Sequence, residues 1–164
     1  MTSPRQRGRA GLWGTAALGV AFGVLDWYVP QLLLGLNRHP VFPFLLYGVW
    51  LVVAVLAVLP AARRGEQPRV FGRIVLVVWT SAVLAYYSYY AALVALVGLP
   101  QLEQLHISQR NAEGFGERWW SLLQTTLLAG VLEWVPVALA GGYVVGWTLG
   151  AVWERVAMRR GAAA

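Results

Sequence analysis

Polar and apolar residues alternate along this chain in long blocks. Four apolar runs are almost free of charge, and short polar segments separate them. About 20 apolar residues are enough for an α-helix to cross the hydrocarbon core of a membrane. The pattern therefore predicts a single membrane domain over residues 1–164. Its expected architecture is an all-α bundle of four transmembrane helices, at about 12–36, 41–62, 70–99 and 119–153.

The last run, 119–153, is longer than one crossing requires, and Pro136 lies in its middle. A proline inside a helix removes a hydrogen bond and crowds the preceding turn. A broken helix is tolerated in a membrane only where protein or water satisfies the freed backbone groups. We therefore favour a tilted, kinked but continuous helix over an interrupted one. Pro30 has a comparable place in the first run, so both prolines mark positions where a helix is predicted to loosen.

The overall composition agrees with a membrane location. Only 12% of the residues are charged, whereas a soluble domain carries about 25%. The chain has no cysteine, which excludes disulfides, thiol redox relays, cysteine-ligated zinc and iron–sulfur clusters within it.

Most of the basic residues, all of which are arginine, lie at the two termini and in the second connection. These are Arg5, Arg7, Arg9, Arg63, Arg64, Arg69, Arg73, Arg155, Arg159 and Arg160. Cytoplasmic segments carry an excess of basic residues, so we expect both termini to be cytoplasmic in a bacterial inner membrane, with lipid as the first partner. The same bias explains the net charge of +6 without a nucleic-acid partner, because no basic face is visible.

Two carboxylates, Asp26 and Glu133, lie deep inside apolar runs. Each costs about 2.5 kcal/mol or more at the centre of a bilayer. Both are predicted near mid-membrane, because each lies about as far into its run as the other. Such residues normally face the interior of a bundle and mark a path for an ion or substrate. An alternative, left open, is that they act only as hydrogen-bonding contacts between helices.

The surroundings of the two acids are alike. Segment 23–30 reads GVLDWYVP and segment 130–136 reads GVLEWVP. An inverted repeat of the kind found in transporters is one interpretation. Helices one and four are not matching halves of a four-helix chain, so we favour coincidence or a shared constraint. In either case, an acid is followed by a tryptophan and then by a proline.

Tyrosines in the third run are predicted near the depth of Asp26. Tyr86 and Tyr90 share one helix face, and Tyr87 lies on an adjacent one. With Asp26, these side chains would line a polar interior suited to protons, a small ligand or a lipid headgroup. Ordinary packing with one hydrogen bond per tyrosine is the alternative. The second run carries few polar groups and is expected to be the helix most exposed to lipid or a partner.

The third connection, 100–118, is the main soluble segment. Its leucine spacing predicts a short interfacial helix, which would act as a lid on the bundle or as a contact for a partner. The two histidines, His39 and His106, fall in connections, so a haem held between membrane helices is not expected. No cofactor or metal site is predicted, and the phosphate-binding, nucleophile and zinc-protease motifs are missing from the sequence.

These patterns favour a small permease or channel that handles a proton, cation or small solute through Asp26 and Glu133. The alternative is a non-catalytic accessory subunit that anchors a larger membrane complex. A lipid-acting membrane enzyme is the third and least favoured class. The expected partners are the lipid bilayer and either further copies of the chain or other membrane subunits.

Overall fold

The computed structural model describes the backbone of residues 4–161 and the side chains of residues 12–159. The terminal arginines at 5, 7, 9 and 160 lie outside the described side chains. Every regular element within the described range is a helix.

The first helix ends much earlier than the predicted range 12–36. Helix α1 spans Pro4–Asp26, and a turn leads to the single-turn helix α2, Val29–Leu32, and to the 3-10 turn η1, Leu34–Leu36. Pro30 lies in the first turn of α2 and has no N–H with which to bond the carbonyl of Asp26 four residues earlier. The regular helix therefore stops at the acid.

Two long helices follow, and each carries a proline in its first turn. Helix α3 spans Phe42–Arg63, and helix α4 spans Pro68–Ala92. A proline is tolerated at this place because the first N–H groups of a helix have no partner within it. Helix α4 continues as the π-helical segment η2, Leu93–Val97, and ends at Gly98, whose φ of 81° favours glycine.

The predicted interfacial helix of the third connection is replaced by two 3-10 turns, η3, Pro100–Leu105, and η4, Ile107–Gln109. Leu105 is buried with Val94 and Leu122, and the Trp119 indole N–H donates to the Leu105 carbonyl at 2.9 Å. The connection thus closes the ends of the neighbouring helices as a packed lid.

The final helical stretch is continuous. Helix α5, Phe115–Leu122, passes through the π-helical segment η5, Leu123–Leu128, into α6, Ala129–Gly161. Pro136 lies inside α6 without ending it, as the sequence favoured.

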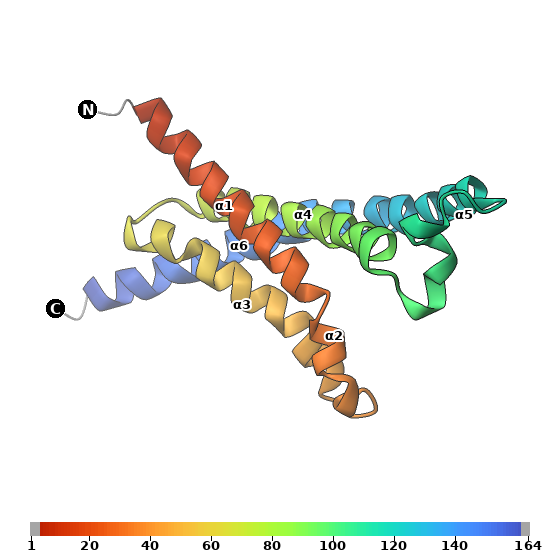
Figure 1. Cartoon of the computed structure of the whole chain (residues 1–164). Coiled ribbons are helices and arrows are strands. Elements are labelled where there is room, and N and C mark those ends of the chain that lie inside the picture. The colour runs from red at the N-terminus through yellow and green to blue at the C-terminus, as the bar shows by residue number, and fades with distance from the viewer. Residues whose placement is uncertain (1–3, 162–164) are drawn as a thin grey trace.

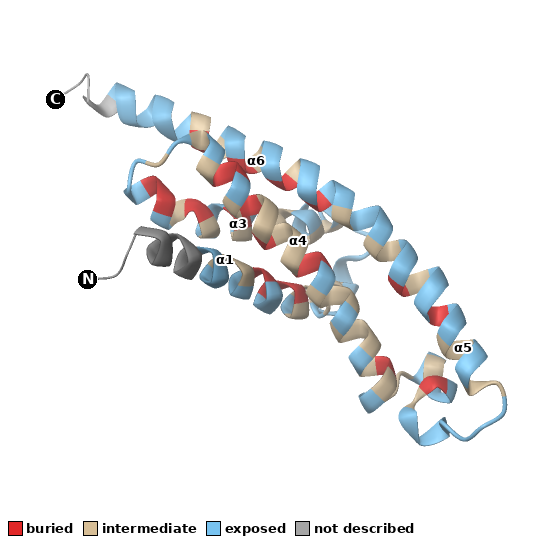
Figure 2. Cartoon of the chain, turned by 90° about the horizontal axis from the view of Figure 1, so that it is seen from above, coloured by how far each residue is buried: buried red, intermediate tan, exposed pale blue. Residues whose placement is uncertain are grey.

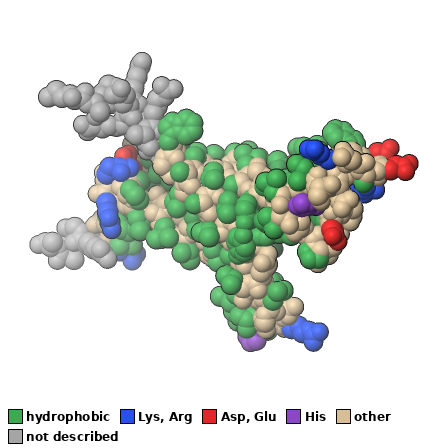
Figure 3. Space-filling view, in the orientation of Figure 1, with side chains coloured by type: hydrophobic (Ala, Val, Ile, Leu, Met, Phe, Trp, Pro, Cys, Tyr) green, Lys and Arg blue, Asp and Glu red, His purple; other side chains and the backbone are tan. Residues whose placement is uncertain are grey.

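Three helices of the described chain are long and apolar enough to cross a membrane: Phe42–Arg63, Pro68–Val97 and Phe115–Arg159. The apolar part of α1, Leu12–Asp26, is shorter. Hydrophobic side chains cover the middle of the face shown in Figure 3. The charged side chains that the structure describes gather at the ends of this face.

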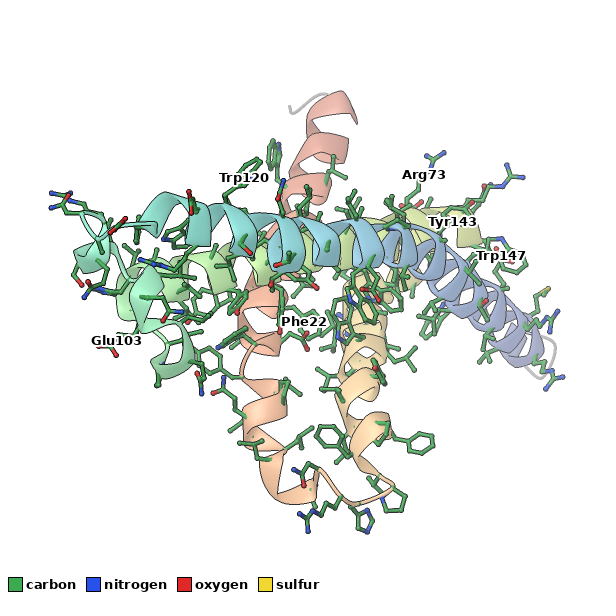
Figure 4. All side chains as sticks on the ribbon, turned by 90° about the vertical axis from the view of Figure 1, so that its right-hand side faces the viewer. Phe22, Arg73, Glu103, Trp120, Tyr143 and Trp147 are labelled. Carbon is green, nitrogen blue, oxygen red and sulfur yellow. The ribbon has the colours of Figure 1, made fainter. Side chains whose placement is uncertain are left out.

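Helix α4 is the centre of the fold. Helix α6 runs antiparallel beside it, and α1 crosses the pair, while the α1–α3 hairpin leaves the pair at a steep angle (Figures 1 and 4). The start of α1, the α3–α4 connection and the end of α6 lie at the same end of the molecule (Figure 1). Helix α2 and the lid beside α5 lie away from that end.

The contacts of α4 depend on glycines spaced four residues apart. Gly19 and Gly23 of α1 lie against the α4 backbone at Val78 and Ala82, so closely that a Cβ atom would overlap it. Gly142, Gly146 and Gly150 of α6 approach α4 in the same way, at Leu76, Phe71 and Pro68. Small residues at this spacing let membrane helices pack backbone to backbone.

Buried side chains lie on the facing sides of the helices, and the outer faces are exposed (Figure 2). About a third of the most apolar window of α4 is buried (33%), against 17% for those of α3 and α6. The second predicted helix is therefore no more exposed than the last one. A bundle that exposes so much apolar surface agrees with a lipid surrounding.

Candidate functional site

A pocket of about 380 Å³ lies where the α1–α3 hairpin diverges from α4 and α6. Half of its lining side chains are aromatic, and only one is charged. The lining residues are Asp26, Pro30, Leu46, Tyr47, Trp50, Trp79, Val83, Tyr86, Tyr87, Trp134, Val137 and Ala138.

Asp26 supplies the charged group. As the last residue of α1, it is half-buried. The Trp50 side chain of α3 lines the same pocket beside this carboxyl group. The Oδ1 atom of Asp26 is buried and has no hydrogen-bond partner. No arginine or histidine lines the pocket, and the one ion pair among the described side chains joins Arg64 to Glu66.

Two of the lining rings, Trp50 and Trp79, belong to a row of aromatic contacts that begins at Phe22. The ring centroids of Phe22 and Trp50 lie 5.0 Å apart, and those of Trp50 and Trp79 lie 5.7 Å apart, both edge to face. The Trp79 indole also donates to the Trp50 carbonyl at 3.3 Å. These contacts join α1, α3 and α4 at the level where Phe22 lies in Figure 4.

The predicted tyrosines divide into two groups. Tyr86 and Tyr87 line the pocket, with their ring centroids 5.3 Å apart. Tyr90 does not line it, because its ring stacks on Trp27 at 4.9 Å and packs against the lid cluster of Val94, Leu105 and Leu122.

The second predicted acid, Glu133, lies outside the pocket. Its side chain is exposed on α6, while the next residue, Trp134, contributes to the pocket lining. Successive residues of a helix point about 100° apart, so the two side chains leave α6 in different directions. Among the described residues, Asp26 lines the pocket and Glu133 does not, so the two acids do not share this site.

The two acids nevertheless lie at similar levels along α4. Tyr86 interacts electrostatically with Asp26, and Tyr87 interacts with Glu133. Tyr86 and Tyr87 are adjacent, with ring centroids 5.3 Å apart, so each acid lies near one ring of this pair.

The aromatic side chains Tyr47, Trp50, Trp79 and Trp134 were not among the predicted site residues. The composition shows that tryptophan and tyrosine are abundant. It does not show that these four side chains point into one pocket, because that depends on how the helices are rotated about their axes. The tryptophan that follows each acid was the one local signal, and only Trp134 lines the pocket.

The lid carries a second, shallower hollow beside Glu103 and His106. The His106 ring is already engaged, with Nδ1 2.8 Å from the Ser108 hydroxyl and Nε2 3.2 Å from the Leu96 carbonyl. No group of three potential metal ligands occurs among the described residues. These contacts assign the lid histidine to packing of the connection.

A lone carboxyl group in an apolar pocket has few stable states. It is either protonated, or ionised beside a positive charge that the pocket itself does not contain. The site is thus suited to exchange one positively charged species for another. Comparison with protein-family models, with curated proteins and with solved structures finds no match to this chain.

Proposed function

We propose that the chain is a small multi-pass membrane protein that handles a proton, a cation or a small solute at the Asp26 pocket. It crosses the membrane four times, through α1 and the three longer apolar helices. Both termini lie in the cytoplasm. The observation that carries the proposal is the half-buried Asp26 carboxyl group, whose Oδ1 atom has no partner. A buried polar atom without a partner needs an explanation, and a transported ligand or proton supplies one.

The position of the acid supports exchange across a membrane. Asp26 ends the regular part of α1, and the short α2 follows it. Irregular backbone at membrane depth is tolerated where it lines a cavity, and the pocket touches this break through Asp26 and Pro30. A carboxyl group beside a helix break can bind and release a cation as the flanking segments move.

Flux measurements in liposomes test this proposal. The purified full-length chain is reconstituted, and proton movement is followed with an internal pH-sensitive dye under an imposed gradient. Wild-type protein is expected to carry protons above the rate of empty liposomes, and Asp26→Asn is expected to abolish the difference. Trp147→Leu is the control, because Trp147 lies on α6 outside the pocket (Figure 4). Equal proton flux for wild type and Asp26→Asn would exclude proton transport through the Asp26 pocket.

Glu133 favours the second candidate, an accessory subunit of a larger membrane complex. Its carboxyl group is exposed on α6 beside Leu132 and Val137, whose exposed fractions are 66% and 52%. An acid facing lipid is costly, and such groups normally pair with another polar group. A polar side chain of a neighbouring subunit is the partner that this candidate requires.

Purification in mild detergent separates the two candidates. An unrelated chain recovered in fixed ratio, and lost on Glu133→Gln, would establish the accessory role. A lone chain or homo-oligomer that retains flux on Glu133→Gln would favour the permease.

A further inference from the structure

The charge of the pocket is unbalanced. Asp26 is the one charged residue among its lining side chains, and Oδ1 has no partner. Ionisation of this carboxyl group inside an apolar site requires a nearby positive charge. Because no basic side chain lines the pocket, that charge must come from a ligand.

The lining favours one kind of cation. Six aromatic residues line the pocket together with the acid: Tyr47, Trp50, Trp79, Tyr86, Tyr87 and Trp134. The faces of tryptophan and tyrosine rings attract cations, and cages of such rings recognise quaternary ammonium groups. The remaining lining, with Leu46, Val83 and Val137, is aliphatic and suits the apolar part of such a ligand.

The same lining is unsuited to a divalent metal ion. Calcium and magnesium require about six or more oxygen ligands, whereas this pocket offers one carboxyl group. No cluster of three metal-ligating side chains was found across the described part of the chain. The volume of about 380 Å³ lies at the lower end of the range for small-molecule sites.

We infer that the Asp26 pocket binds a small lipophilic organic cation, an amine or quaternary ammonium compound, between the carboxylate and the aromatic rings. The inference deepens the proposed function, on which it rests, by naming the class of solute. Asp26 neutralises the charge of the cation, and the rings of α3, α4 and α6 surround its apolar groups.

Isothermal titration of the purified full-length protein with three soluble probes tests the chemistry. The probes are benzyltrimethylammonium, choline and 3,3-dimethyl-1-butanol, which has the shape of choline without its charge. Benzyltrimethylammonium is expected to bind most tightly because it adds apolar surface. The uncharged alcohol is expected to bind roughly a hundredfold more weakly than choline, because it lacks the interaction with Asp26.

Variants locate the binding. Asp26→Asn is expected to weaken benzyltrimethylammonium binding roughly a hundredfold, and Trp134→Leu or Tyr47→Leu roughly tenfold. Tyr47 and Trp134 are 59% and 40% exposed, so their replacement leaves the helix packing intact. Trp147→Leu is the matched control, since Trp147 lies on α6 with 48% exposure and does not line the pocket. It is expected to bind benzyltrimethylammonium as the wild type does.

Two results would overturn the inference. One is equal affinity for choline and its uncharged analogue, which would make the pocket a general apolar cavity. The other is benzyltrimethylammonium binding that Asp26→Asn leaves unchanged. If either result accompanies proton flux that depends on Asp26, the organic cation is excluded and the proposed function stands. If that flux is also missing, Asp26 handles neither an organic cation nor a proton, and both proposals fail for these two species.

Discussion

The two acidic segments have nearly the same letters but different surroundings. In segment 23–30 the acid, Asp26, ends a helix and lines a pocket; in segment 130–136 the acid, Glu133, lies within a continuous helix and is exposed. Each acid lies near one ring of the tyrosine pair of α4, so the two acids lie at similar levels along this helix. The difference therefore lies in the direction of the side chain and in the state of the backbone.

One extra residue accounts for much of this difference. Tyr28 places Pro30 four positions after Asp26, whereas Pro136 follows Glu133 by three. Pro30 cannot donate to the carbonyl of the acid itself, and the helix ends there. Pro136 instead leaves the carbonyl of Leu132 without its usual donor, and α6 continues. A similar sequence thus ends the helix in segment 23–30 and leaves it continuous in segment 130–136.

The glycine three residues before each acid provides the strongest test of this comparison. A Cβ atom at Gly23 would meet the backbone of Ala82, but at Gly130 it would meet the ring end of Tyr87. Backbone cannot move aside, whereas a side chain can turn. Gly23→Ala is therefore expected to lower the free energy of unfolding by about 2–3 kcal/mol, and Gly130→Ala by less than about 1 kcal/mol.

Unfolding in mixed micelles with increasing SDS, followed by tryptophan fluorescence, measures both effects. Gly48→Ala is the control for helix propensity, because a Cβ atom at Gly48 meets nothing within 4 Å. Equal losses at Gly23 and Gly130 would contradict the difference in packing.

Replacement of each acid by leucine separates burial from exposure. Asp26→Leu removes a buried oxygen without a partner, so the free energy of unfolding is expected to rise by about 1–2 kcal/mol. Glu133→Leu changes an exposed side chain, and its effect on the isolated chain is expected to stay within about 0.5 kcal/mol. Of the two variants, only Asp26→Leu is expected to abolish flux. A functional residue often lowers stability, so its replacement can stabilise the chain and remove the function together. If Glu133→Leu raises the free energy of unfolding instead, Glu133 on α6 is the acid that is shielded from water.

Helix positions were more predictable than helix faces. The run 41–62 and the helix Phe42–Arg63 agree closely, because hydropathy decides which segments avoid water. The proximity of Tyr86 and Tyr87 to Asp26 could be predicted, because all three residues were expected at about the same depth in the membrane. The exposure of Glu133 did not, because it depends on the rotation of α6 against α4. That rotation is set by Gly142, Gly146 and Gly150, which lie against the α4 backbone. Their spacing of four is visible in the sequence, but the helix that they meet is not.

Proline replacement tests the backbone half of the comparison. Pro136→Ala restores a donor for the Leu132 carbonyl within α6 and is expected to raise the free energy of unfolding by about 1 kcal/mol. Pro30→Ala supplies an N–H opposite the Asp26 carbonyl, so α1 is expected to extend past the acid. It is expected to lower stability by about 0.5 kcal/mol through greater freedom of the unfolded chain. Hydrogen exchange at residue 136 reads the restored bond directly, and rapid exchange there would count against it.

The smallest expected effect concerns the inserted residue itself. The Tyr28 hydroxyl is hydrogen-bonded to the Tyr89 hydroxyl of α4, and no residue of segment 130–136 corresponds to it. Because this contact is exposed, Tyr28→Phe is expected to cost only about 0.5 kcal/mol and to leave flux unchanged. Tyr28 thus acts chiefly through the spacing it creates between Asp26 and Pro30, not through its hydroxyl group. A loss of flux in Tyr28→Phe comparable to that of Asp26→Asn would show that the hydroxyl pair belongs to the transport path.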